Sequence, residues 1–302
     1  MKIPPSLQKG DKIAIVCTAR SFAEDDLKSV LPVLYGWGLQ PVLGTTIGLQ
    51  LHQFAGSDED RSKDFEAQLK DKNIKAILCA RGGYGTVRMI DGIDFGFLEA
   101  HPKWIVGYSD VTALHSHIHT HYDTATLHAT MPISFPSNSV EALESLRKAL
   151  FGETLVHSFE AHPMNRNGIG EGQLIGGNLS ILYSLMASPS DIDTAGKILF
   201  LEDLDEYLYH IDRMIVNLKR SGKLKGLRGL VIGGMTEMSD NTTPFGKTAL
   251  DIIQEHTAEY DYPVAYGFPA GHLDDNRALV MGAKARLEVG ETCRLDFVGL
   301  DK

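Results

Sequence analysis

The chain has 302 residues, of which 43% are hydrophobic, and its 39 acidic residues outnumber its 29 lysines and arginines to give a formal net charge of −10. This length and composition suffice for one large or two ordinary soluble domains. The charge argues against a nucleic-acid partner, because neutralising phosphates requires a basic surface and no segment is dense in lysine or arginine.

The cysteines and the hydropathy of the sequence indicate the cellular compartment in which we expect the protein. Cys17, Cys79 and Cys293 are widely spaced in apolar runs, which is typical of reduced thiols rather than of a disulfide framework. The first residues lack the apolar segment of a secretory signal, and no later run is long enough to cross a bilayer. We therefore expect a cytoplasmic protein without a membrane partner.

The first half of the chain alternates short apolar runs with amphipathic segments, as in a layered α/β domain. A helix is expected from Ser21, which has a capping-box partner in Glu24, to about residue 37, and a second from Ser57 to about residue 72. The strands that we predict here cover residues 12–19, 41–43, 74–80, 104–108 and 126–128. Ligands of open α/β sheets bind at the carboxyl ends of strands, so the loops after these strands are the candidate site.

Periodicity fades between residues 152 and 170, which predicts an N-terminal domain over 1–155, a linker over 156–170 and a C-terminal domain over 171–302. The elements predicted in the second domain are strands at 172–175, 197–201 and 229–232 and helices at 179–186 and 207–221. Residues 277–289 and 293–297 alternate apolar and polar side chains, which indicates antiparallel strands or a small barrel-like sheet.

The segment 104–114 predicts a strand, a sharp turn and the start of a helix, with Ser109 at the bend. Such a turn presents the hydroxyl at the sheet edge and directs the following backbone N–H groups toward the group that it attacks. Serine is also a preferred helix N-cap, so a capping role for Ser109 is the alternative. Asp110 and Thr112 could satisfy the helix start in its place.

A nucleophilic serine needs a base, usually a histidine oriented by a carboxylate. Glu202 directly follows the apolar run 197–201, whereas most of the acids from Asp203 to Glu206 are expected to open the next helix. His272 lies in a loop rich in glycine and proline, where it is either a catalytic base or an exposed residue without a role.

Two glycine turns could bring backbone close to a ligand. Arg81-Gly-Gly-Tyr-Gly85 follows the predicted strand 74–80, but its spacing matches neither the dinucleotide nor the Walker pattern. The N–H of Gly83, together with that of Asp110, is a candidate oxyanion donor. The second turn, Gly176-Gly-Asn178, either lines the same cleft or packs tightly.

Four histidines alternate along one predicted helix, from His115 to His121. His115 with His119, and His117 with His121, have a spacing that can bind zinc. Both pairs lack the glutamate of the H-E-x-x-H pattern, and alternate positions point to different helix faces. We expect packing or surface histidines here, and neither a metal nor another cofactor, although a metalloenzyme is an alternative.

Five motifs, taken together, indicate a known family. They are Gly-Tyr-Ser-Asp-Val-Thr, Arg-Gly-Gly-Tyr-Gly, Gly-Gly-Asn-Leu, Phe-Leu-Glu-Asp and Gly-His. On them the chain resembles the LD-carboxypeptidase family of serine peptidases over nearly its whole length. That family contains murein tetrapeptide carboxypeptidases of cell-wall recycling and relatives that confer microcin C immunity. One departure is that relatives often have His-Gly-Pro where this chain has His128-Ala-Thr130.

The resemblance implies a catalytic triad of Ser109, Glu202 and His272. It also implies a flavodoxin-like or Rossmann-like N-terminal domain and a C-terminal α/β domain with a β-barrel-like core, with the active site at their junction. Homodimers are common in the family, so a homodimer is expected.

The activity that the resemblance implies is hydrolysis, through an acyl-enzyme, of the amide bond to the terminal D-alanine of a muropeptide tetrapeptide. An exopeptidase must recognise a free carboxylate, for which Arg81 is a candidate, and Asn178 is a candidate for further substrate contacts. Two alternatives stay open: hydrolysis of a microcin C-like aminoacyl-nucleotide amide, and non-catalytic binding of a small molecule between two lobes.

Overall fold

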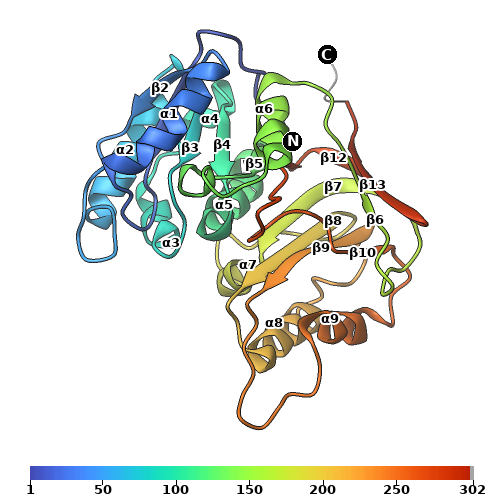
Figure 1. Ribbon diagram of the computed structural model, residues 1–302. Helices are drawn as coiled ribbons and strands as arrows, with labels where there is room; N and C mark the ends of the chain where they lie inside the picture. Colours follow the sequence, from blue (N-terminus) through green and yellow to red (C-terminus); the bar gives the residue numbers. More distant parts are fainter. Residues whose placement is uncertain (300–302) are drawn as a thin grey trace.

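Two β-sheets organise the computed structural model, which describes residues 1–299 (Figure 1). In the first sheet the strand order is β11-β5-β4-β3-β1-β2, with β1 to β5 parallel and β11 antiparallel to β5. The order 2-1-3-4-5 is that of flavodoxin-like folds, so the predicted fold of the N-terminal half is confirmed. The strands are β1 (Lys12–Val16), β2 (Gln40–Leu43), β3 (Ile74–Cys79), β4 (Trp104–Gly107), β5 (Thr126–His128) and β11 (Leu279–Met281).

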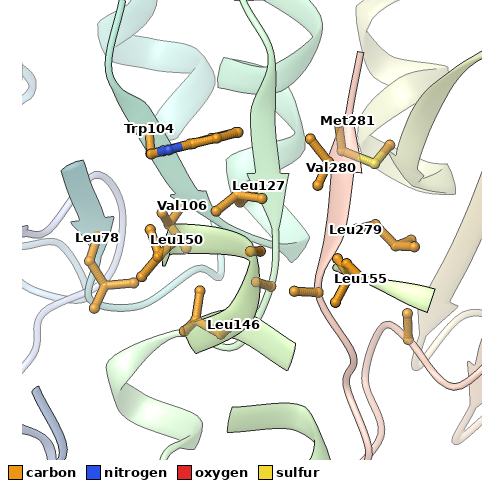
Figure 2. Packing of buried hydrophobic residues seen from close by; sticks show 14 of the residues in the cluster. Leu78, Trp104, Val106, Leu127, Leu146, Leu150, Leu155, Leu279, Val280 and Met281 are labelled. Carbon is orange, nitrogen blue, oxygen red and sulfur yellow. The ribbon is translucent and has the colours of Figure 1, made fainter. Parts of the chain in front are cut away.

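Helices cover both faces of this sheet. On one face, Leu146 and Leu150 of α6 belong to the same buried cluster as Val106 of β4 and Leu127 of β5 (Figure 2). The apolar side chains of α2 and α5 form a second cluster on the other face. The helices of this half are α1 (Leu27–Gly36), α2 (Asp58–Lys70), α3 (Thr86–Met89), α4 (Phe97–Ala100), α5 (Thr112–Tyr122) and α6 (Val140–Phe151), with 3-10 turns η1 (Glu24–Asp26), η2 (Ile90–Gly92), η3 (Ser109–Val111) and η4 (Pro132–Ser134).

The two predicted helix starts have different outcomes. Ser57 caps α2 as expected, because its side chain accepts a hydrogen bond from the N–H of Asp60. The predicted start at Ser21 is wrong: the N–H of Ser21 donates to the carbonyl of Gln53. That bond holds Ser21 against the neighbouring segment, and helical turns begin only at Glu24.

The second sheet has the strand order β10-β9-β8-β7-β12-β13-β6, parallel from β10 to β7 and antiparallel beyond. One face is covered by α7, α8 and α9, with α8 and α9 lying below the sheet in Figure 1. The elements are β6 (Val156–Glu160), β7 (Gly168–Asn178), α7 (Leu179–Leu185), β8 (Ile198–Leu204), α8 (Leu208–Arg220), β9 (Gly229–Thr236), α9 (Ala249–Thr257), β10 (Val264–Tyr266), β12 (Lys284–Val289) and β13 (Thr292–Phe297).

The expected barrel-like core is wrong in one respect, since no closed barrel forms within residues 1–299. The antiparallel strands extend the parallel half sideways, and β6 and β10 remain the sheet edges. Arg166, in the connection after β6, makes only an isolated bridge to Val264 of β10.

The last third of the chain contributes to both sheets. β11 joins the first sheet by pairing with β5, before β12 and β13 join the second. The segment 156–170, predicted as a linker, contains β6, which pairs with β13. The division into 1–155, 156–170 and 171–302 stays a prediction about folding units.

Candidate active site

Ser109 lies at the sharp bend between β4 and α5, with a φ of +62°. This left-handed conformation is unusual for a residue with a Cβ, and it is typical of strained functional turns. Glycines flank the bend on both sides. A Cβ at Gly107 would lie 2.8 Å from Val111, and one at Gly82 would lie 3.3 Å from the hydroxyl oxygen of Ser109.

The alternative that Ser109 is a helix cap is wrong. The turn η3 follows Tyr108 as N-cap, and no side chain caps it. Asp110 and Thr112 also have other partners: Asp110 Oδ2 accepts a hydrogen bond from the N–H of Thr86 at 2.8 Å, and Thr112 Oγ1 accepts one from the N–H of Asn178 at 3.0 Å.

The structure brings Ser109, Glu202 and His272 together. Nε2 of His272 is 3.2 Å from the hydroxyl oxygen of Ser109, and Nδ1 is 2.7 Å from Oε2 of Glu202. The Glu202 side chain is fully buried, whereas that of His272 is 16% exposed. A buried carboxylate bound to Nδ1 fixes the ring so that Nε2 can take a proton from the hydroxyl. The arrangement can therefore support nucleophilic catalysis.

Glu202 and His272 reach this point through local backbone features. Glu202 lies inside β8, opposite Asn178 of β7, and a register irregularity follows at Asp203. His272 follows Gly271, whose φ is +103° and whose added Cβ would lie 2.7 Å from Oε2 of Glu202. The N–H of Gly271 donates to Oδ1 of Asn276 at 2.8 Å, which holds the loop.

A cleft of about 610 Å³ opens above Ser109, between the two halves of the chain. One wall follows β1 and β3, where the strand order of the first sheet reverses and where ligands of such folds bind. The opposite wall follows β7 and β8. The first wall includes Arg20, Arg81, Gly82 and Gly83, and the second includes Asn178, Ser180, Asp203, Asp205 and Glu206.

The other predicted site residues also line or adjoin this cleft. Within residues 1–299, the backbone N–H groups of Gly83 and Asp110 donate no hydrogen bond. Part of the Arg81 guanidinium is already hydrogen-bonded within the protein, since its Nη1 donates to the carbonyl of Ser21 at 3.3 Å. Asn178 caps α7 by accepting a hydrogen bond from the N–H of Ile181 at 3.1 Å.

Comparisons with known proteins agree with these observations. The sequence matches the LD-carboxypeptidase N-terminal domain over residues 13–129 and the LD-carboxypeptidase C-terminal domain over residues 171–287. The chain belongs to the LD-carboxypeptidase family. The family predicted from the motifs is thus confirmed.

The match to known relatives covers almost the whole chain. The chain is 35% identical to a probable murein peptide carboxypeptidase of Bacillus subtilis (strain 168), over 99% of this chain and 95% of the relative. The crystal structure of muramoyltetrapeptide carboxypeptidase from Oxalobacter formigenes is similar, with a TM-score of 0.87 at 26% identity over 96% of this chain and 100% of that one. The microcin C7 self immunity protein MccF, in complex with aspartyl sulfamoyl adenosine, shares the fold with a TM-score of 0.88 at 21% identity over 100% of both chains.

Acidic neighbours raise the pKa values of two groups in the site. Burial alone would lower the pKa of His272, but the hydrogen bond and charge of Glu202, with the charges of Asp203 and Glu237, outweigh it and raise this pKa above its ordinary value. Burial, and then the charge of Glu202, raise the pKa of Asp203 to about 7.

Two residues of the cleft were missed from the sequence. Asp203 was expected to open a helix, but it lies buried in β8 and accepts hydrogen bonds from the side-chain amide of Asn178 and the N–H of Ser180, both at 2.9 Å. Arg20 follows β1, and its position after a strand end was the only signal in the sequence.

The four histidines of α5 make separate contacts. His115 binds the carbonyl of Gly107 at 2.9 Å, and His119 binds the hydroxyl of Thr126 at 3.0 Å. His117 and His121 contact the segment around Ser190 instead. Among residues 1–299 no three potential ligands cluster as a metal site would require, and no helix is long and apolar enough to cross a membrane.

Proposed function

We propose that this protein is a serine-type LD-carboxypeptidase that hydrolyses the amide bond to the terminal D-alanine of muropeptide tetrapeptides in cell-wall recycling. The observation that carries the proposal is the chain of contacts from Ser109 through His272 to Glu202 at the base of the cleft. The names of the murein-peptide relatives supply the substrate class.

In the proposed mechanism, Nε2 of His272 takes the hydroxyl proton as the Ser109 oxygen attacks the amide carbonyl carbon. The tetrahedral intermediate collapses when the C–N bond breaks and His272 returns the proton to the departing amine of D-alanine. An acyl-enzyme on Ser109 remains. Water, deprotonated by His272, then hydrolyses that ester and restores the serine.

Two groups of the site stabilise charge in this scheme. The N–H groups of Gly83 and Asp110 are the proposed donors to the oxyanion. Within residues 1–299 they donate no other hydrogen bond, Asp110 directly follows Ser109, and Gly83 lines the same cleft. Glu202 fixes the ring of His272 and stabilises its cation, which agrees with the raised pKa of that histidine. Arg81 and Asn178 are proposed to contact the substrate from opposite walls.

The test is incubation with a tetrapeptide ending in D-alanine and with its L-alanine epimer, followed by mass detection of released alanine. We expect release from the D-epimer only, and none from a Ser109→Ala variant. Release from neither peptide overturns the proposal. Turnover of an aminoacyl sulfamoyl adenosine by the same preparation would then favour the microcin C-like activity, and binding of a small molecule without turnover would favour the non-catalytic alternative.

We also propose that the protein acts in the cytoplasm as a homodimer. Its three cysteines are buried free thiols, as suits a reducing compartment, and burial raises the pKa of Cys17 and Cys79 to about 12. Light scattering on a sizing column gives the mass directly. A monomeric mass at micromolar concentration would contradict the dimer.

A further inference from the structure

Arg20 is held at the mouth of the candidate oxyanion hole. Its N–H donates to the carbonyl of Gly82 at 3.4 Å, and an isolated bridge joins it to Phe54, so the backbone is fixed from both sides. The side chain crosses over Gly83. A Cβ at Gly83, whose φ is +108°, would lie 2.6 Å from Cδ and 2.7 Å from Nε of Arg20. A side chain at Gly83 would displace the arginine from this position.

The guanidinium of Arg20 is not paired within the part of the chain that the structure describes, although its charge acts on the buried carboxyl of Asp110, where it opposes the burial that raises the pKa of that group. Within residues 1–299 the guanidinium forms neither an ion pair nor a side-chain hydrogen bond, although the residue is exposed in the cleft. Nearby arginines differ: Arg81 donates to the carbonyl of Ser21, and Arg88 pairs with Asp58. An unpaired guanidinium can donate two parallel N–H hydrogen bonds to the two oxygens of a carboxylate.

The substrate of a carboxypeptidase carries its free C-terminal carboxylate close to the scissile bond. In a C-terminal residue, three bonds separate the attacked carbonyl carbon from the carboxylate carbon, so the two carbons lie within roughly 4 Å. A cation that binds this carboxylate must therefore be a neighbour of the oxyanion donors. Arg20 meets this condition because it lies directly on Gly83. The opposite wall carries Asp205 and Glu206, which would repel a carboxylate.

We propose that Arg20 binds the free C-terminal carboxylate of the substrate and thereby restricts this enzyme to terminal residues. The inference rests on the proposed carboxypeptidase function and moves the carboxylate contact predicted for Arg81 to Arg20. Arg81 keeps its proposed substrate contact on the same wall, and its bond to the Ser21 carbonyl also holds the segment that presents Arg20.

The experiment compares kcat/KM for two peptides, the tetrapeptide with a free terminal D-alanine and the same peptide ending in D-alaninamide. Wild-type enzyme should prefer the acid. Arg20→Gln should lower kcat/KM for the acid by about 10- to 100-fold, as loss of a charged hydrogen bond does, and leave the rate on the amide nearly unchanged. Arg20→Lys should recover part of the loss. Arg294→Gln, on an exposed arginine of β13, is the matched control and should change neither rate.

The outcomes separate the two proposals. Equal losses on both peptides, or no loss on the acid, overturn the role of Arg20 while leaving the activity intact. A larger selective loss in Arg81→Gln than in Arg20→Gln overturns the assignment in favour of Arg81. If wild-type enzyme releases alanine from neither peptide, the carboxypeptidase function itself fails, and the inference fails with it.

Discussion

Replacing Ser109 by glycine and by alanine should separate catalysis from backbone strain. Both substitutions remove the hydroxyl and its contact with His272, so both should abolish turnover. They differ in how they tolerate the φ of +62° at this position. Alanine keeps a Cβ that clashes in the left-handed region, whereas glycine does not.

The sign of the stability difference follows from these two effects. Relief of the left-handed conformation favours glycine by roughly 1–2 kcal/mol, and the greater freedom of glycine in the unfolded chain costs about 0.5–1 kcal/mol. The Ser109→Gly variant should therefore be more stable than Ser109→Ala by up to about 1.5 kcal/mol, or up to about 4 °C in Tm for a chain of this size.

Scanning calorimetry of the two variants measures this difference. Ala67→Gly in the interior of α2 is the control for an ordinary helical position, where the same exchange should cost about 1 kcal/mol. A Ser109→Gly protein less stable than Ser109→Ala would refute the reasoning that strain is stored at the nucleophile.

Glu202→Gln should lower kcat by about 10⁴-fold while the protein stays folded, because a neutral amide no longer fixes the ring of His272 with Nε2 ready to accept the serine proton. A loss below tenfold in steady-state assays would contradict this. The raised pKa of His272 predicts that kcat/KM falls on acidification with a midpoint above 6.5, because a protonated imidazole cannot accept the serine proton. Asp203→Asn should move this midpoint slightly to lower pH, because the ionised fraction of Asp203 helps to raise that pKa and its own pKa of about 7 leaves it only partly charged there. An unmoved midpoint refutes the coupling, and Glu291→Gln, in an exposed turn, should leave the midpoint in place. Gly271→Ala should cost more than 1 kcal/mol of stability and lower kcat by at least about tenfold, because the added Cβ would contact the Glu202 carboxylate and the backbone has a positive φ there. Wild-type stability and kcat in this variant would rule out this packing.

Local patterns were enough to find Ser109 and its partners as candidates. Ser109 follows β4, Glu202 follows the apolar run of β8, and His272 lies in the loop after β10. Loops and strand ends of this kind are where α/β proteins place their chemistry. The parallel sheet of the first half followed from the same alternation of apolar and amphipathic segments. These features depend on residues close together in the chain, which a sequence displays directly.

The features that were missed depend on distant parts of the chain. Arg20 borders the site only because β1 lies next to β3, which a strand order but no local motif reveals. Asp203 is buried because Asn178 and Ser180, about two dozen residues earlier, supply its hydrogen bonds. The open second sheet depends on the pairing of β12 with β7, more than a hundred residues before it.

The nucleophilic role of Ser109 is tested most directly by covalent labelling with a fluorophosphonate, followed by intact-mass measurement and mapping of the modified peptide. We expect one adduct per chain on Ser109, and no adduct in the His272→Ala variant, because the hydroxyl reacts only with that base beside it. No adduct on the wild-type protein, or an adduct on a different residue, would contradict the assignment of Ser109 as the nucleophile.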